Sequence, residues 1–304
     1  MRTPAEVTVV EVGPRDGLQN EAKAVPLAAK RALIEALDQA GCPRIEVGSF
    51  VSPRWVPQMA DTGALAQSLP LLRATTSVLV PNAKGLEAAL ATDVPEIAVF
   101  AAASETFSQK NTRCSRDEAA ARLVPVIRQA KAEGRFVRVY VSCVVACPYE
   151  GPVAPAAVAR LAEKLMAAGG DEVSLGDTIG RATPRDTQAV IDAVALAVPL
   201  SQIAWHGHDT YGQALANVLA ALDRGVTVID AAVAGLGGCP FAPGAAGNLA
   251  TEDLVYMLDG LGVRTDIDLD RLAAAGQKIC QTLERSPTGR VALALERQSV
   301  FRHA

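Results

Sequence analysis

Aromatic residues are scarce in this chain, and their scarcity limits what its core can be made of. They account for 4% of the 304 residues, whereas hydrophobic residues account for 50%. The core must therefore be built from alanine, valine, leucine and isoleucine, which favours helices packed repeatedly on a sheet. A chain of this length can be one large domain or two ordinary ones, because α/β barrels often reach it as a single domain.

Several targeting and partner signals are also missing. No apolar run is long enough to span a membrane, and no basic segment followed by an apolar stretch precedes Val7, so we expect a cytoplasmic protein. The net charge is -4 without a block of like charge, which argues against nucleic acid as a partner. Scattered cysteines argue against a disulfide framework and favour buried free thiols, at Cys42, Cys114, Cys143, Cys147, Cys239 and Cys280.

Short β-rich runs alternate with longer helical patterns along the whole chain. The predicted strands are Val7–Val12, Arg44–Val47, Thr76–Val80, Glu96–Phe100, Phe136–Cys143, Glu172–Leu175, Ile203–His206 and Val226–Ala232. The predicted helices between and after them are Leu27–Ala40, Lys84–Ala91, Ser115–Glu133, Pro155–Ala168, Pro184–Val198, Gln213–Arg224 and Thr251–Gly260. This alternation, without a break in composition, predicts an α/β fold of the (β/α)8 TIM-barrel type, with a doubly wound open sheet as the alternative.

We expect residues 1–304 to form one TIM-barrel catalytic domain. The barrel should span about 5–265, followed by a short C-terminal helical extension at about 266–304. That tail contains helical patterns at Leu269–Glu284 and Val291–Leu295, with Ser286-Pro287-Thr288-Gly289 between them. It is too small for a regulatory domain, so we expect it to pack on the barrel or to contribute to the mouth of the site.

Histidine is rare, and two of the three histidines stand together. His206 and His208 lie two positions apart at the end of a predicted strand. Side chains at this spacing point to the same side of a strand, so both imidazoles can converge on one point. The spacing is typical of metal ligands, although a hydrogen-bonded structural pair would have it too.

In a barrel the active site lies at the carboxyl ends of the strands, and acidic and basic residues occur there in the first two units. Asp16 follows the first strand and can join the two histidines as a third metal ligand, while Arg15 can stabilise an oxyanion or enolate. A solvated turn with an Arg–Asp ion pair is the alternative. Glu46 lies within an apolar strand and needs an ion pair or a function to offset its burial.

Three further residues lie at later strand ends. Asp177 could hydrogen-bond Arg15 or an imidazole, or could cap the following turn. Cys239 lies in a glycine-rich loop after the last strand, where a thiol over the barrel mouth can serve catalysis. Asn248 could cap the next helix or turn its amide oxygen to the metal.

Five stretches carry a specific resemblance that covers nearly the whole chain. Together they resemble the 3-hydroxy-3-methylglutaryl-CoA (HMG-CoA) lyases, which are DRE-TIM metallolyases. The motif that singles out the lyases is Gly235-Leu236-Gly237-Gly238-Cys239-Pro240. The five stretches are Glu11–Glu21, Ser49–Met59, Ser174–Gly180, His206–Asn217 and Gly235–Leu258.

The resemblance implies a TIM barrel that uses one Mg²⁺ or Mn²⁺ to cleave HMG-CoA into acetyl-CoA and acetoacetate, the chemistry of leucine degradation and ketone body formation. It implies an acyl-CoA substrate and a homodimer. By position in the motifs it assigns the metal to Asp16, His206, His208 and Asn248. It assigns catalysis to Arg15, Cys239, Asp177, Glu46 and His206, and substrate binding to Gln19, Ser49, Ser174 and Thr178.

The implied reaction breaks a C–C bond beside a tertiary alcohol. A divalent ion would lower the pKa of the hydroxyl, a base would remove its proton, and Arg15 would offset the enolate charge. Asp16 and His206 are both candidates for the base, and Cys239 or a metal-linked water is the candidate acid. The family more often has cysteine where this chain has Gly207, at a position expected to face away from the lumen.

Three alternative functions are kept beside this one. The first is the same lyase reaction on a longer 3-hydroxy-3-alkylglutaryl-CoA. The second is a Claisen-condensing acyl-CoA synthase of the same superfamily, which is disfavoured because such enzymes commonly carry a larger C-terminal domain. The third is a non-catalytic metal-binding or scaffold protein.

Overall fold

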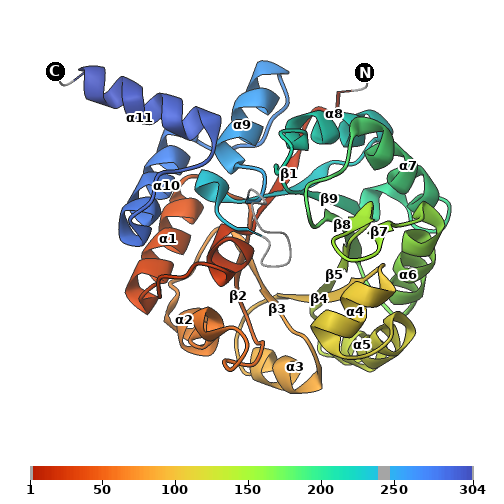
Figure 1. Ribbon diagram of the computed structural model, residues 1–304. Coiled ribbons are helices and arrows are strands. Elements are labelled where there is room, and N and C mark those ends of the chain that lie inside the picture. The colour runs from red at the N-terminus through yellow and green to blue at the C-terminus, as the bar shows by residue number, and fades with distance from the viewer. Residues whose placement is uncertain (1–2, 239–246, 303–304) are drawn as a thin grey trace.

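The strands form the inner wall of a barrel. The computed structural model describes residues 3–238 and 247–302, and within them eight parallel strands close on one another (Figure 1). Around the barrel they follow the order β1-β10-β9-β8-β5-β4-β3-β2. Their bounds are β1 Thr8–Glu11, β2 Arg44–Ser49, β3 Thr75–Leu79, β4 Glu96–Ala102, β5 Phe136–Ser142, β8 Glu172–Asp177, β9 Ile203–Gly207 and β10 Val228–Ala231. The closed parallel order confirms the (β/α)8 prediction and excludes the open sheet.

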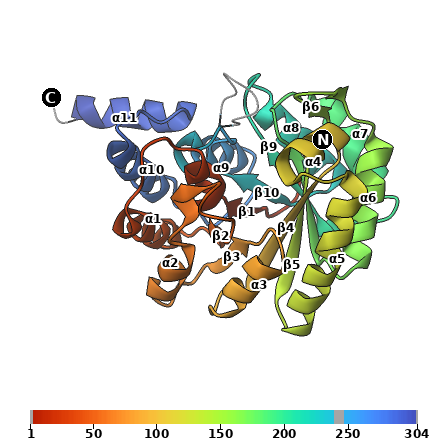
Figure 2. The ribbon, with the colours of Figure 1, turned by 60° about the horizontal axis from the view of Figure 1, so that its bottom comes forward.

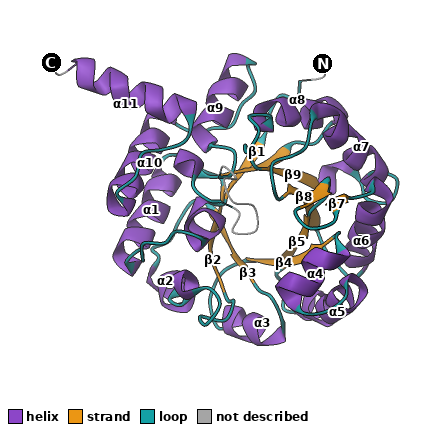
Figure 3. Cartoon of the chain, in the orientation of Figure 1, coloured by secondary structure: helices purple, strands orange, loops and turns teal. Residues whose placement is uncertain are grey.

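Helices surround the strands as an outer ring (Figure 3). The apolar core lies between the two rings, because parallel strands and amphipathic helices bury their apolar faces against each other. Capping boxes begin two of the helices, at Ser115 with Glu118 and at Thr183 with Asp186. The outer helices are α1 Leu27–Gln39, α2 Thr62–Ser68, α3 Ala83–Leu90, α4 Glu105–Thr112, α5 Arg116–Ala132, α6 Pro155–Ala167, α7 Pro184–Val194, α8 Ala214–Arg224 and α9 Thr251–Gly260.

Some elements differ from the sequence prediction. Helix α7 ends at Val194, four residues before the predicted end at Val198. Helices α2 and α4 and the hairpin of β6 (Ala146–Cys147) and β7 (Gly151–Pro152) were not predicted. They are short, and α4 is mostly polar, so none of them carries the apolar periodicity that marks a helix or strand.

The lumen of the barrel holds ion pairs as well as apolar side chains. Near the amino ends of the strands, Arg44 pairs with Glu96 and Glu172. Deeper in, Arg138 pairs with Glu172 and Asp230 at 2.9 and 2.6 Å. Each buried charge thus has a partner of opposite sign, which offsets the cost of removing it from water.

The C-terminal extension packs on the barrel. Helix α10 (Leu269–Leu283) contacts α1, and α11 (Arg290–Arg302) lies against α9 and α10 and extends beyond the barrel (Figure 2). Between α10 and α11, Thr288 donates hydrogen bonds to the carbonyl oxygens that follow β10. No helix among the described residues is long and apolar enough to cross a membrane.

Candidate active site

A tight turn after β1 carries the first two site residues. This π-helical turn, η1 (Gly13–Gly17), places Arg15 and Asp16 above the strand ends. The carbonyl oxygen of Val12 accepts hydrogen bonds from the amides of both Arg15 and Gly17. A Cβ atom at Gly13 would lie 2.6 Å from the Glu11 carboxylate, so the turn requires glycine there.

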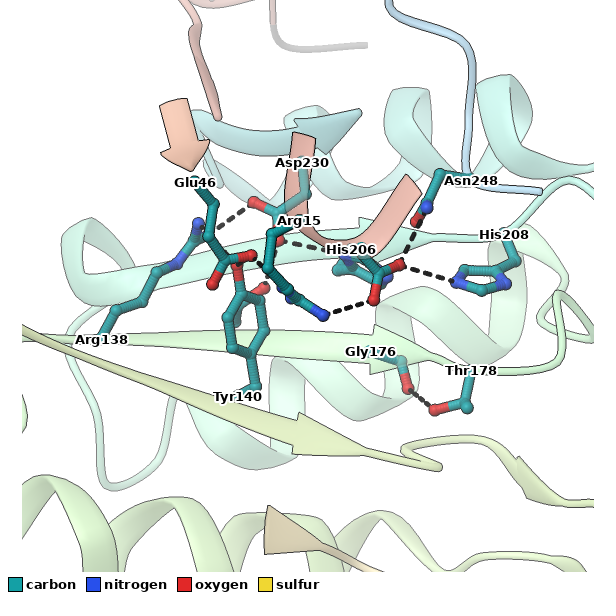
Figure 4. Close-up of polar contacts among 12 residues, drawn as sticks. Arg15, Glu46, Arg138, Tyr140, Gly176, Thr178, His206, His208, Asp230 and Asn248 are labelled. Atoms are coloured by element: carbon teal, nitrogen blue, oxygen red, sulfur yellow. Dashed lines mark hydrogen bonds and ion pairs between the residues drawn. The ribbon is translucent and has the colours of Figure 1, made fainter. Parts of the chain in front are cut away.

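Asp16 meets His206 on β9 and His208 directly after it. One ligand atom from each of Asp16, His206 and His208 lies within 4.8 Å of the others, and Nε2 of His208 is 4.0 Å from Oδ2 of Asp16 (Figure 4). The two imidazole rings lie 5.3 Å apart between centroids and tilt by 50°. The convergence expected from the histidine spacing is therefore present, and a carboxylate from η1 completes it.

Asn248 lies beside this cluster. Its amide nitrogen donates to Oδ2 of Asp16 at 2.9 Å and to the carbonyl oxygen of Leu236 at 3.2 Å. Its amide oxygen is buried without a hydrogen-bond partner, which is costly unless a ligand uses it. Helix α9 is capped by Ala250 without a side-chain bond, so the alternative that Asn248 caps it is wrong. One carboxylate, two imidazoles and a free amide oxygen fit a single divalent cation.

Arg15 is held between two carboxylates. Its Nε donates to Glu46 at 2.6 Å and its Nη1 to Asp16 at 2.5 Å. Burial raises the pKa of Asp16, but Arg15 and the two histidines outweigh it and hold the pKa well below its ordinary value. Burial of Glu46 raises its pKa despite Arg15. Asp16 is therefore ionised and available as a ligand at neutral pH.

Three residues near Arg15 and His206 were not predicted from the sequence: Arg138, Tyr140 and Asp230. The ring of Tyr140 lies between the guanidinium groups of Arg15 and Arg138, at 5.5 and 5.0 Å, and its hydroxyl donates to Glu46 (Figure 4). Asp230 accepts hydrogen bonds from Arg138 at 2.6 Å and contacts Nδ1 of His206 at 3.2 Å. Asp230 lies inside an apolar strand, the same signal that singled out Glu46, and could have been found by it.

The remaining predicted residues differ in their surroundings. Gln19 and Thr178 line the cavity at the strand ends, whereas Ser49 and Ser174 do not. The Ser49 hydroxyl donates to the Leu79 carbonyl and the Ser174 hydroxyl to Asp230, both buried. Their assignment to substrate binding stays a prediction. In the structure their hydroxyl groups bond to other groups of the protein.

Asp177 takes the capping alternative. Its two carboxylate oxygens accept the backbone amides of Arg181 and Ala182 at 3.0 and 2.8 Å, and burial raises its pKa to about 6. It is not hydrogen-bonded to Arg15 or to an imidazole, so its role as a supporting acid stays a prediction. Cys239 lies outside the described residues, and its catalytic role likewise stays a prediction.

Gly207 is explained by its neighbour on the strand. Trp205 is fully buried, and a Cβ atom at Gly207 would lie 3.1 Å from the indole Nε1. The two positions lie on the face of β9 opposite His206 and His208, because side chains alternate along a strand. The departure from the family motif therefore concerns packing outside the lumen and leaves the histidines in place.

A cavity of about 530 Å³ opens over these residues at the carboxyl ends of the strands. One part is polar, formed by Arg15, Asp16, His206 and His208. The other part extends over β3, β4 and α5. Its wall holds the apolar side chains of Val51, Leu79, Phe100, Phe107, Leu123 and Val141 beside the polar ones of Asn82, Asn111, Thr112 and Arg122.

The fold and site define a class: a TIM barrel with a metal-type donor cluster and a buried arginine at the carboxyl ends of its strands. Within that class, the chain belongs to the HMGL-like family, whose model matches residues 6–279. It is 53% identical over 292 residues to the mitochondrial hydroxymethylglutaryl-CoA lyase of Bos taurus, covering 96% of this chain and 90% of that protein.

The chain is also similar to bacterial hydroxymethylglutaryl-CoA lyases. The chain is 51% identical to the 3-hydroxy-3-isohexenylglutaryl-CoA/hydroxymethylglutaryl-CoA lyase of Pseudomonas aeruginosa, covering 97% of this chain and 99% of that one. The crystal structure of a hydroxymethylglutaryl-CoA lyase from P. aeruginosa superposes with a TM-score of 0.96 at 51% identity, covering 98% and 100% of the two chains. An HMG-CoA lyase from Acinetobacter baumannii, solved with coenzyme A and 3-methylmalate, superposes with a TM-score of 0.91 at 35% identity, with 95% of each chain covered.

Proposed function

We propose that this protein is a carbon–carbon lyase that cleaves HMG-CoA into acetyl-CoA and acetoacetate. The observation that carries the proposal is the joining of Arg15, Asp16 and the two histidines at one end of the barrel, in a chain that is 53% identical to a hydroxymethylglutaryl-CoA lyase. An acyl-CoA substrate is further supported by the A. baumannii relative, which was solved with coenzyme A.

One divalent cation, Mg²⁺ or Mn²⁺, would be held by Asp16, His206, His208 and Asn248. Bound there, it would lower the pKa of the substrate hydroxyl. Asp230 contacts Nδ1 of His206, which leaves Nε2 as the ring nitrogen available to a ligand. The neighbouring Arg15 keeps Asp16 ionised, so that it stays a ligand or can accept the hydroxyl proton.

Arg15 is placed to stabilise the enolate of acetyl-CoA. Glu46 and Asp16 fix its Nε and Nη1, and Tyr140 packs against its guanidinium group, so the charge is oriented before substrate arrives. A preorganised cation next to developing negative charge lowers the barrier without further rearrangement. The enolate carbon then needs a proton, and Cys239 or a metal-linked water is the predicted donor.

A longer 3-alkyl substituent is the second candidate substrate feature. The P. aeruginosa relative is named for both isohexenylglutaryl-CoA and methylglutaryl-CoA, and the part of the cavity over β3, β4 and α5 could hold such a chain. The homodimer, the cytoplasmic location and the roles in leucine degradation and ketone body formation stay predictions.

The test is an assay of purified protein with HMG-CoA and Mg²⁺ or Mn²⁺. We expect release of acetyl-CoA, and loss of at least about 100-fold in kcat in the Arg15→Gln variant, since removing one such group costs that much in comparable sites. No acetyl-CoA with either metal would overturn the proposal. Condensation of acetyl-CoA with a 2-oxo acid would instead support the synthase alternative.

A further inference from the structure

Glu11 is a fully buried carboxylate at the end of β1 that the proposed mechanism does not use. Its Oε1 accepts hydrogen bonds from the backbone amides of Gly13 at 2.8 Å and Val233 at 2.9 Å. Its Oε2 accepts one from the hydroxyl of Thr251 at 2.6 Å. One side chain thus joins three segments of the chain, the first of which lies more than 200 residues from the other two.

Each of these segments leads to the metal cluster. Gly13 begins η1, which carries Asp16. Val233 begins a short 3-10 turn, η4 (Val233–Gly235), directly before Leu236, whose carbonyl oxygen accepts a hydrogen bond from Asn248. Thr251 begins α9, three residues after Asn248. Asp16 and Asn248 are joined by a hydrogen bond. Glu11 therefore contacts both the segment that carries Asp16 and the segments next to Asn248.

These segments pack closely against one another. A Cβ atom at Gly17, in η1, would lie 2.7 Å from Cβ of Leu236, and one at Gly237 would lie 2.6 Å from the amide nitrogen of Asn248. Segments in such close contact transmit a displacement of one to the others. A group that sets their spacing consequently sets the spacing of the ligands they carry.

A second buried carboxylate acts on η4 by itself. Both oxygens of Glu252 accept the amide of Ala234, at 3.0 and 2.9 Å. Ala234 has a φ of 58°, a left-handed conformation that alanine rarely adopts. Glu252 holds this residue but makes no hydrogen bond to η1 or to Thr251, which distinguishes its contacts from those of Glu11.

We propose that Glu11 is a positioning residue for the metal cluster: by bridging Gly13, Val233 and Thr251 it sets the distance between Asp16 and Asn248. The inference rests on the proposed function only in that the same cluster is taken to bind the cation. Groups that orient ligands in this way typically change metal affinity about 10- to 100-fold when removed.

The experiment measures the Kd of Mn²⁺ by titration calorimetry, with folding checked by circular dichroism. Glu11→Leu removes all three acceptor contacts, and we expect its Kd to rise by about 10- to 100-fold. In Glu11→Gln the amide oxygen can accept both backbone amides and the NH₂ can donate to the Thr251 oxygen, so we expect a Kd within a few-fold of wild type. Glu252→Gln is the matched control, with an expected change within about twofold.

Thr251→Val keeps the inference testable if Glu11→Leu does not fold. It removes only the link to the Asn248 segment and is nearly isosteric, so we expect a folded protein with a several-fold higher Kd for Mn²⁺. Wild-type affinity in a folded Glu11→Leu or Thr251→Val protein would overturn the inference. Failure of the proposed function gives a different result, which is normal Mn²⁺ binding without acetyl-CoA release.

Discussion

At the scale of single residues, the pair Trp205 and Gly207 shows how this chain departs from its family without losing its site. The indole fills the space that a side chain at 207 would need, since a Cβ atom there would lie 3.1 Å from Nε1. Both residues are fully accommodated in the layer between β9 and the helices, away from the lumen. The glycine between the histidines is therefore tied to the tryptophan before them.

We predict a strong coupling between substitutions at these two positions. Gly207→Cys should destabilise the protein by about 1–3 kcal/mol through overpacking. Trp205→Val alone should cost about 3 kcal/mol or more through the cavity it leaves. Combined, the two should cost less than their sum by at least about 1 kcal/mol, measured by urea unfolding in a double-mutant cycle.

A control separates packing from function in that cycle. Since both side chains point away from His206 and His208, Mn²⁺ affinity of each folded variant should stay near that of wild type. Additive stability effects would show that the two positions do not share a volume.

At the scale of elements, the sequence predicted what depends on local pattern. The eight strands are buried apolar runs between turns, and helices α1, α3, α5, α6, α8 and α9 lie within two residues of the predicted bounds. Gly225 ends α8 in the left-handed conformation with a φ of 94°, as a glycine after a helix should.

What sequence could not predict depends on contacts between units. The π-helical turn η1 packs against Leu236, which lies more than 200 residues from it in the chain. Asp230 lies 92 residues from Arg138 and 24 from His206, and only closure of the barrel makes them partners. Single strands could therefore be identified, whereas the pairing of their inward side chains could not.

The tail gives the prediction that belongs to this scale. Thr288, in the linker between α10 and α11, donates its amide to the Ala234 carbonyl at 3.0 Å and its hydroxyl to the Gly235 carbonyl at 3.0 Å. Thr288→Val should lose the hydroxyl bond, cost about 1 kcal/mol and speed amide hydrogen exchange in η4. The measurement is exchange mass spectrometry on peptides covering residues 230–238.

Thr282→Val is the matched control for that exchange experiment. Thr282 lies on α10 and its hydroxyl bonds only to the Lys278 carbonyl of the same helix, at 3.2 Å. It should leave exchange in η4 unchanged. Equal protection in the Thr288 and Thr282 variants would mean that the tail does not hold η4.

At the scale of the whole molecule, buried charge is arranged in two ways. In the lumen, acids pair with the guanidinium groups of Arg15, Arg44 and Arg138. Outside the lumen, near η4, Glu11 and Glu252 have hydrogen-bond donors but no cationic partner in the structure described. Burial raises their pKa values to about 7 and about 8.

These two acids make stability fall as pH rises through neutrality. Their pKa values are near 4.5 in an unfolded chain, so the folded protein binds more protons between pH 4.5 and 8. The stability they contribute is fully present below pH 4.5 and is lost as pH rises through about 7 and about 8. Besides burial, the nearby carboxylates of Glu11 and Asp253 raise the pKa of Glu252.

Replacing Glu252 tests this directly, because Glu252→Gln cannot ionise. The difference in free energy of unfolding, variant minus wild type, should increase by up to about 4 kcal/mol from pH 5 to pH 8.5, since one pKa unit is about 1.4 kcal/mol. Urea unfolding at equal protein concentration measures the difference at each pH, with the exposed Glu87→Gln of α3 as control. A difference between Glu252→Gln and wild type that stays constant with pH would mean that Glu252 is ionised throughout, held by its bonds to Ala234.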